Sequence, residues 1–550
     1  MEVHGPLNKM KKYFYFFLIA VLSASINNVW AQPVAIPFST DSSSKLEILP
    51  GSGNYSFEKI DSFNTIITLA RRARIKQDKT LIESDSAKVN LYTKIMEAFG
   101  NVHINDQDTL NTYSRYIKYF GKEKKALLKS AVRLTDSKGG TLTTEELLYD
   151  LNTRIATYNN GGKLVNKNTV LTSKEGTYYS ETKDVIFKKN VVLIDPEYKL
   201  VSDSLLYNAS SEIVRFVAPT TIINGNRKIY TRDGFYNLKT GEAYFGKRAT
   251  IIDSTQSIVA DESAFDDKNG LAQFKGNVIY KDTAQGVSIL SGAMSLDKKN
   301  STMLATRHPV MILKQDKDSL YITADTLYSG RLTDRGKIKN IPVVTDTIKN
   351  KRVFDLNGKD SASNRFFEAF HHVRIFSDSL QAVCDSMFYS SVDSAFRLYT
   401  NPVVWANNSQ VTGDTIYLFT KNKVAERLYA FENGFIINKV NNNFFNQVKG
   451  RTINGLFIDG NIDFIRTKGS AESVYYAQDE EEKFIGVNKA TADVIDMYFK
   501  DKAANKIVFR NDLKGTTYPI QKIKPEELKL RGFNWQDAKR PKTKYELFAN

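Results

Sequence analysis

Two short phrases recur along this chain at a spacing close to 30 residues, and this recurrence constrains the fold more than any single residue does. The first phrase runs from an acidic residue through apolar residues to an aromatic one; its copies are DSLLYN (203–208), DGFYN (233–237), DESAFD (261–266), DTLY (325–328), DSMFY (385–389) and DTIY (414–417). The second phrase lies between copies of the first, as MEAFGNVHI (96–104), AQFKGNVIY (272–280) and the diverged FEAFHHVRI (367–375). A fixed period indicates a stacked architecture, because one unit cannot bury its apolar face alone.

Within the units, apolar and polar residues alternate with period two. Val102 and Ile104, for example, flank His103. This pattern is typical of strands with one buried face. Gly100 and Asn101 precede that strand and belong to the residue types that accept turn conformations. Each unit is therefore predicted to contain strand, turn and strand, and the expected fold class is all-β, as an elongated repeat stack.

The repeats divide the chain into segments of different character. Arg331 to Asn364 is charged and breaks the period, and residues 519–550 contain Pro525, Pro541 and many basic residues. We expect the latter to stop the stack, because an open sheet end recruits other strands. The predicted organisation is a signal peptide at 1–31, a flexible leader at 32–62, a β-repeat region at 63–330, a charged loop or join at 331–364, a second β-repeat region at 365–518 and a polar C-terminal tail at 519–550.

The N-terminus has the features of an export signal. Lys9, Lys11 and Lys12 precede an apolar run at residues 13–24, and Val29-Trp30-Ala31 fits a small-residue cleavage rule. The run is too short for a comfortable transmembrane helix, although an uncleaved anchor stays open as an alternative. The chain is therefore expected to be exported; the family resemblance given below implies the periplasm, with association with the outer membrane as a further expectation.

The chain is strongly basic, with a formal net charge of +16. Removal of residues 1–31, which hold three Lys and one Glu, leaves +14. A basic exported protein favours a polyanionic neighbour: a phosphorylated glycolipid, an anionic membrane surface or a polysaccharide. Export argues against nucleic acid as a partner, and a general role of the charge in solubility is the competing interpretation.

No sequence motif for catalysis, metal or cofactor binding was found. The chain has no P-loop, dinucleotide fingerprint, HExxH, GxSxG or CxxC motif. His371 and His372 take the place of the Gly-Asn pair, so a turn is favoured over a metal site, and Cys384 is predicted to be a buried, inert thiol. The repeated acids could form a calcium ladder or catalytic pairs, but their sparse spacing favours capping of backbone N–H groups. We therefore expect no catalytic residues, no metal and no cofactor.

The pairing of the acid-led phrase with F-x-G-N-V-x-I resembles the OstA family, which includes the periplasmic lipopolysaccharide-transport protein LptA and the N-terminal domain of LptD. The similarity covers roughly residues 65–420 and continues more weakly to about 515. It implies a V-shaped β-jellyroll trough that holds the acyl chains of lipopolysaccharide and joins other transport components strand edge to strand edge. The mature length of 519 residues exceeds that of a typical single trough protein, and no regular series of membrane-barrel hairpins is present.

The resulting hypothesis is a non-enzymatic periplasmic protein that binds and transports lipopolysaccharide or a lipid A-like glycolipid in outer-membrane assembly. Strand alternation selects the candidate groove residues Val102, Ile104, Val191, Leu193, Leu205, Tyr207, Val278, Tyr280, Val373 and Ile375. Two alternatives stay open. A carbohydrate-active stacked-β enzyme would use acids such as Asp203 and Asp233, and a structural envelope repeat protein would have a filled interior.

Overall fold

The computed structural model describes residues 34–35 and 46–547, apart from most of 333–364 and gaps of one to four residues at turns. The chain divides into two compact units: Met1–Ser254 with Asp261–Gly270, and Thr255–Ala260 with Leu271–Asn550. The predicted signal peptide, most of the residues 32–45 of the predicted leader and most of the predicted join at 331–364 lie outside the described residues. The division between the units falls near residues 254–270. The charged loop or join at 331–364 stays a prediction.

Unit 1 consists of consecutive strands in its described part. They are β1 (Val34–Ala35), β2 (Leu46–Ile48), β3 (Asn54–Lys59), β4 (Thr65–Ala70), β5 (Ala73–Gln77), β6 (Thr80–Ser84), β7 (Ser86–Asn90), β8 (Ile95–Asp106), β9 (Leu110–Phe120), β10 (Lys125–Asp136), β11 (Thr141–Asp150), β12 (Ile155–Tyr158), β13 (Gly162–Asn166), β14 (Thr169–Ser173), β15 (Glu175–Tyr179), β16 (Asp184–Ile194), β17 (Lys199–Asn208), β18 (Ile213–Phe216), β19 (Thr220–Asn224), β20 (Arg227–Thr231), β21 (Gly234–Asn237), β22 (Glu242–Phe245), β23 (Ala249–Asp253) and β25 (Glu262–Asp266).

Unit 2 continues the same pattern and adds short 3-10 turns. Its elements are β24 (Gln256–Ala260), β26 (Leu271–Asp282), β27 (Val287–Asp297), β28 (Thr302–Thr306), β29 (Val310–Lys314), β30 (Ser319–Thr323), β31 (Thr326–Arg331), β32 (Thr345–Asp346), β33 (Lys351–Arg352), β34 (Arg365–Phe376), β35 (Gln381–Ser390), β36 (Ala395–Tyr399), β37 (Val403–Ala406), β38 (Ser409–Thr412), β39 (Thr415–Lys421), β40 (Val424–Lys439), β41 (Phe445–Ile458), β42 (Asn461–Gln478), β43 (Phe484–Lys500), β44 (Ala503–Arg510), β45 (Lys514–Tyr518), η4 (Ile520–Lys522), η5 (Pro525–Leu528), η6 (Asp537–Lys539) and η7 (Lys544–Leu547).

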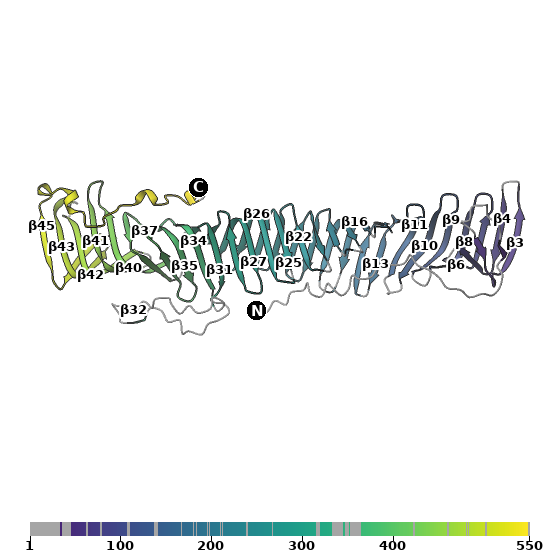
Figure 1. Cartoon of the computed structure of the whole chain (residues 1–550), viewed down its shortest axis with the longest axis horizontal. Helices are drawn as coiled ribbons and strands as arrows, with labels where there is room; N and C mark the ends of the chain where they lie inside the picture. Colours follow the sequence, from purple (N-terminus) through teal and green to yellow (C-terminus); the bar gives the residue numbers. More distant parts are fainter. Residues whose placement is uncertain are drawn as a thin grey trace. The chain divides into compact units, whose positions relative to one another are not determined.

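The strands of each unit pair antiparallel in a meander that is bent into two walls. In β8, residues 95–99 pair with β7 and residues 103–106 pair with β6, so one strand contributes to both walls. We call the wall that contains residues 95–99 the first wall and the wall that contains residues 102–106 the second wall, and we extend both names along the meander. Figure 1 shows the strands of each unit following one another side by side in chain order. The predicted all-β stack is confirmed, and each 30-residue repeat runs once from the first wall to the second and once back.

The chain passes from the first wall to the second through a pair of residues with positive φ. Gly100 and Asn101 have φ values of 66° and 29°, and the register of β8 shifts at this point. The register shifts in the same way in β10, β16, β26, β34 and β40, at pairs that have positive φ: Ser130-Ala131, Lys189-Asn190, Gly276-Asn277, His371-His372 and Glu432-Asn433. We call these pairs outgoing corners. A bulge bends a strand sharply, which is why Gly and Asn recur in the second phrase.

The chain returns to the first wall through a different device, which we call the return corner. In unit 1 a buried Ser or Thr donates its hydroxyl hydrogen bond to the backbone carbonyl two residues later. Examples are Ser84 to Ser86 at 3.0 Å, Ser202 to Ser204 at 2.9 Å and Thr231 to Asp233 at 2.7 Å. Local bonds of this kind let a strand turn without leaving a buried hydroxyl unpaired. An acid directly follows such a hydroxyl at Ser84-Asp85 and at Ser202-Asp203, and Asp203 opens a copy of the first phrase.

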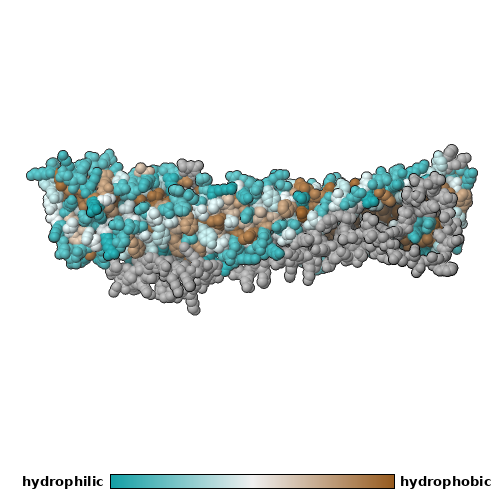
Figure 2. Space-filling model, viewed as in Figure 1, coloured by the Kyte–Doolittle hydropathy of each residue, from teal (hydrophilic) through white to brown (hydrophobic). Residues whose placement is uncertain are grey.

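The apolar core lies between the two walls. In unit 1, one cluster joins first-wall residues such as Met96 and Ala98 to second-wall residues such as Val102 and Val132. A second cluster joins Phe187 and Leu205 in the same way to residues of the second wall. Figure 2 shows apolar side chains gathered between hydrophilic ones along the strands. The interior between the two walls is therefore apolar along the length of the meander.

Candidate functional site

The predicted groove residues lie on the inner faces of the walls. Val102, Val191, Val278 and Val373 each follow an outgoing corner directly, and all four are at most 1% exposed. Side chains farther along the strands are less uniformly buried. Leu193 and Ile375 are buried on the second wall, as are Leu205 and Tyr207 on the first, whereas Ile104 and Tyr280 are half-buried. The sequence thus selected equivalent inner positions, which are tightly packed beside the corner and more open toward the strand ends.

The half-buried apolar residues form the accessible part of this interior. In unit 1 they include Leu134 and Leu142 beside the first cluster, and Leu164, Ile222 and Ile229 beside the second. These five belong to strands of the second wall, whereas Ala126, Val185 and Phe265 are half-buried on the first wall. Both walls therefore contribute to the accessible part of the interior.

Tyr158 closes the interior of unit 1 at one point, and the sequence gave no clear sign of this role. Its hydroxyl, on the first wall, lies 2.6 Å from the Ser173 hydroxyl on the second wall. Burial raises the pKa of the Tyr158 phenol. A Cβ placed on Gly162 or Gly176 would lie 2.5 or 2.3 Å from the Tyr158 ring. The two glycines therefore make room for a tyrosine that bridges the walls.

The row of return-corner hydroxyls is a second feature that sequence analysis missed. The sequence carried little signal for it, because among the six copies of the first phrase only DSLLYN has a Ser or Thr, Ser202, directly before its acid. Cys384 occupies the same place before Asp385 in unit 2 and is buried. Burial raises the pKa of its thiol to about 12, so the thiol stays protonated at neutral pH. This agrees with the predicted inert cysteine.

The repeated acids link neighbouring corners through side chains more often than through backbone N–H groups. Asn101 donates to Asp85 at 3.0 Å, and Arg248 donates to Asp261 at 3.0 Å. An acid bonded to a backbone N–H, as proposed from the sequence, is seen where Ala131 donates to Glu145 at 3.4 Å. The acids thus lie at the outer side of the bend and support its geometry.

The histidine pair stands at an outgoing corner, as its register predicted. His371 Nδ1 lies 3.2 Å from Asp385 Oδ1, and His372 Nδ1 lies 3.0 Å from Asp325 Oδ2. The two rings therefore contact different acids. In the part of the chain that the structure describes, no group of three or more His, Cys, Asp or Glu side chains is placed to hold a metal ion.

Two open depressions lie along the outer face of the second wall in unit 1 and share Asn190 in their linings. They measure about 730 and 860 Å³. Basic residues are prominent in both linings, together with tyrosines, Glu145 and Asp203; the basic residues are Arg133, Lys163, Lys174, Arg232, Lys247 and Arg248. The outer face of this wall therefore offers cationic side chains, on the opposite side from the apolar interior.

Comparison with known proteins identifies an OstA-like region in the chain. Residues 54–203 match the sequence model of the family described as OstA-like protein. The resemblance to the OstA family is thus confirmed for this stretch. A sequence search of curated proteins gives no match.

Solved structures that resemble part of the chain include LptH from Pseudomonas aeruginosa, described as the LptA-homologous periplasmic component of the conserved lipopolysaccharide transport device. That alignment has 12% sequence identity and a TM-score of 0.19, and it covers 26% of this chain and 82% of LptH. A likeness of this size supports no inference about the present chain. Within the described residues, no helix has the length and apolar character needed to cross a membrane.

Proposed function

We propose that this chain is a non-enzymatic periplasmic protein that binds lipopolysaccharide, or a similar lipid A-like glycolipid, and takes part in its transport to the outer membrane. The observation that carries the proposal is the apolar interior between two bent walls, repeated in equivalent positions along unit 1. Burial of one methylene group contributes about 0.8 kcal/mol, so acyl chains need a long apolar surface. The OstA-like match of residues 54–203 supports the same class.

The charge distribution supports a phosphorylated lipid over a neutral one. Arg133, Lys163 and Lys174 line one outer depression of unit 1, and Arg232 and Arg248 line the other. Such residues would attract the phosphates of a lipid head group that approaches this face. Basic side chains at a polyanionic surface also accelerate encounter, an effect that salt weakens.

We also propose that other transport components join this chain through strand edges. Among the described residues, β44 and β45 both pair with β43 and with no later strand. Strand addition at such an edge uses main-chain hydrogen bonds and is a common way to bind an extended partner. Export by the predicted N-terminal signal would bring the chain to the compartment where these partners are found.

Site-specific photocrosslinking tests the lipid site. A photoreactive residue at Leu134 or Tyr280, which are half-buried on the inner face, should capture lipopolysaccharide. A matched control at Lys281, the exposed neighbour of Tyr280 whose side chain points to the opposite face, should capture much less. The same probe at Val102, Val191 and Val278 tests the positions chosen from the sequence.

The tight packing at the corners favours one alternative, a structural stack protein with a filled interior. Inner valines with at most 1% exposure and the Tyr158 bridge are the observations behind it. Equal capture at inner and outer positions, or no capture at either, would favour this alternative over lipid transport.

A further inference from the structure

The C-terminal tail, residues 519–547, folds back along the outer face of the second wall in unit 2. In Figure 1 this yellow segment runs from β45 over the strands toward β34. Five side chains stand in register on that face across successive neighbouring strands, in the order Gln381, Trp405, Gln410, Ile437 and Gln447. Glutamines thus alternate with apolar residues in a row that crosses the strands.

Two of these glutamines bind the main chain of the tail with both ends of their carboxamide. Gln410 donates to the Asn534 carbonyl at 2.8 Å and accepts from the Gln536 N–H at 2.7 Å. Gln447 accepts from the Leu530 N–H at 2.9 Å and donates to the Leu528 carbonyl at 3.4 Å. Each glutamine contacts two backbone groups of the tail that lie two residues apart. The pair therefore recognises the main chain of an extended peptide.

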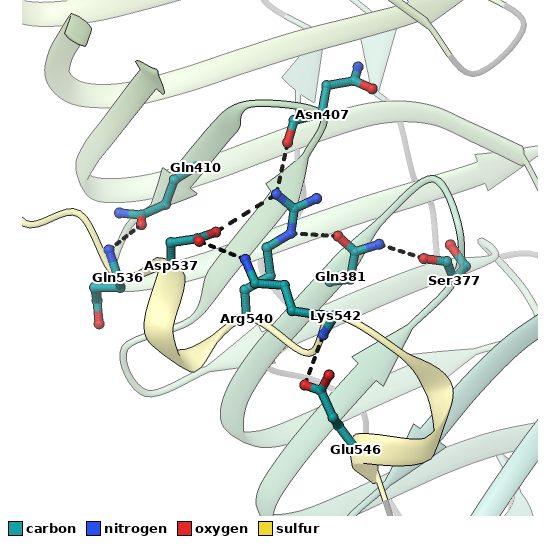
Figure 3. Close-up of polar contacts among 9 residues, drawn as sticks. All are labelled: Ser377, Gln381, Asn407, Gln410, Gln536, Asp537, Arg540, Lys542 and Glu546. Atoms are coloured by element: carbon teal, nitrogen blue, oxygen red, sulfur yellow. Dashed lines mark hydrogen bonds and ion pairs between the residues drawn. The ribbon is translucent and has the colours of Figure 1, made fainter. Parts of the chain in front are cut away.

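The third glutamine fixes the far end of the tail. Gln381 accepts a hydrogen bond from Arg540 Nε at 2.8 Å, and Arg540 Nη1 donates to the Asn407 carbonyl at 2.8 Å (Figure 3). Farther along, Arg374 Nη1 donates to the Glu546 carbonyl at 2.8 Å. The tail is therefore held at regular intervals by side chains of the wall.

Apolar contacts determine which spacing of side chains along a peptide fits this face of the wall. Leu528 and Leu530 are buried in one cluster with Phe435, Ile437 and Val474 of the wall. Two tail rings also pack on one wall residue: the Phe533 and Trp535 rings lie 5.4 and 5.6 Å from the ring of Phe445. The resulting pattern is Leu-x-Leu-x2-Phe-x-Trp, in which four side chains enter the wall and the intervening backbone meets glutamines.

Both glutamines are buried beneath the tail. Gln410 is 1% exposed and Gln447 is 2% exposed. If the tail left without replacement, water would take over its contacts with the glutamines, but Leu528, Leu530 and the apolar wall residues packed against them would be exposed to water, which is costly. An equivalent peptide would restore the contacts, so the face favours exchange of one such segment for another over an empty state.

We propose that the outer face of the second wall in unit 2 is a peptide-binding site, and that it exchanges its own tail for the tail of a second copy of this chain. Residues 519–527 connect β45 to the first fully buried anchor, Leu528. Nine extended residues span about 30 Å, which is enough to leave one molecule and reach another. Exchange of an identical element costs little because the same contacts form in both arrangements. This site is separate from the lipid site, on the opposite face of the wall.

The exchange can be tested in the full chain by inserting a protease recognition sequence after Lys524 and cutting it in place. A fluorescent peptide of residues 525–550 should then replace the cut tail and bind with a saturable rise in anisotropy. Gln410→Ala with Gln447→Ala should weaken binding on the order of tenfold or more, because four hydrogen bonds to the tail backbone are lost. Gln273→Ala, at an exposed strand position of unit 2, is the control and should leave binding unchanged.

Two further measurements make each outcome decisive. A peptide with the same composition in scrambled order should fail to bind, because the spacing of Leu528, Leu530, Phe533 and Trp535 is lost. Two differently labelled full-length copies, mixed at high concentration, should form mixed oligomers that the glutamine variants reduce. Equal binding of the scrambled peptide, or the absence of both peptide exchange and mixed oligomers, would overturn the proposal.

Discussion

The second walls of the two units differ in what covers their outer face. In unit 1 the outer positions carry polar and basic side chains such as Arg133 and Lys163, which stay exposed to solvent. In unit 2 the corresponding face carries Phe435, Ile437 and Tyr476, and the C-terminal tail lies on it. The comparison teaches that the same wall of bent strands can either face solvent or form the middle layer of a thicker structure.

The largest expected effect comes from placing a charge beneath the tail. Leu530→Asp should lower the free energy of unfolding of unit 2 by about 3 kcal/mol or more, because a buried leucine is lost and a carboxylate enters an apolar cluster. Leu513→Asp, at a position 57% exposed, is the control and should change stability by less than about 0.5 kcal/mol. Denaturant unfolding followed by tryptophan fluorescence measures both. Equal effects would show that the tail does not form a second core.

Replacing a buried acid in unit 2 should lower the free energy of unfolding more than replacing an exposed corner acid in unit 1. Asp496 accepts hydrogen bonds from Arg466 Nε at 2.6 Å and Arg510 Nε at 2.8 Å. Asp496→Asn should cost about 3 kcal/mol, because two arginines lose their carboxylate. The equivalent change at the exposed Asp85, which accepts from Asn101, should cost less than about 1 kcal/mol.

The same acid also predicts a pH dependence. Burial by itself raises the pKa of Asp496, but hydrogen bonds from Arg466 and Arg510 outweigh it and hold the pKa below the ordinary value of 3.8. The stabilisation is therefore complete above about pH 4 and is lost as the pH falls through the lower folded-state pKa. Unfolding curves of the wild type and Asp496→Asn should converge in that acidic range. Constant separation between the curves would contradict this assignment.

A smaller effect is expected at the return corners. Ser202 donates to the Ser204 carbonyl and contacts the Thr220 hydroxyl at 2.8 Å, so Ser202→Ala should cost about 1 kcal/mol. Cys384→Ser should change stability by less than this, because the new hydroxyl can make the bond found in unit 1. Thermal unfolding measures both variants. A thiol reagent should leave Cys384 unmodified in the folded protein, and rapid labelling would contradict its buried place.

The smallest expected effect is at an outgoing corner. Ala131 has a φ of 53°, a conformation that costs a residue with a Cβ about 1 kcal/mol. Ala131→Gly should raise the free energy of unfolding of unit 1 by about 0.5 kcal/mol, since relief of strain is partly offset by the greater freedom of glycine in the unfolded chain. Ala126→Gly, in a regular part of β10, should lower it instead. If both substitutions changed the free energy of unfolding in the same direction, the corner would not be strained.

Local patterns in the sequence were sufficient to predict much of the fold. Period-two alternation around His103 placed Val102 and Ile104 on one face, and the Gly-Asn pair marked the corner. The register placed His371 and His372 at the equivalent corner, where the structure has them. The acids were harder to interpret, because their partners, such as Asn101 for Asp85, depend on which strands become neighbours.

What the sequence by itself determined is the repeat, the all-β class and the inner face of each strand, because these follow from local spacing and the two-residue period of a strand. Only the tertiary structure decided how far the inner face is filled, as at Tyr158, and which outer face is covered. The contact between Gln447 and Leu530 joins residues 83 positions apart, and that between Arg374 and Glu546 joins residues 172 apart. Alternation assigns a side chain to a face, but only long-range packing determines whether that face meets water or another part of the chain.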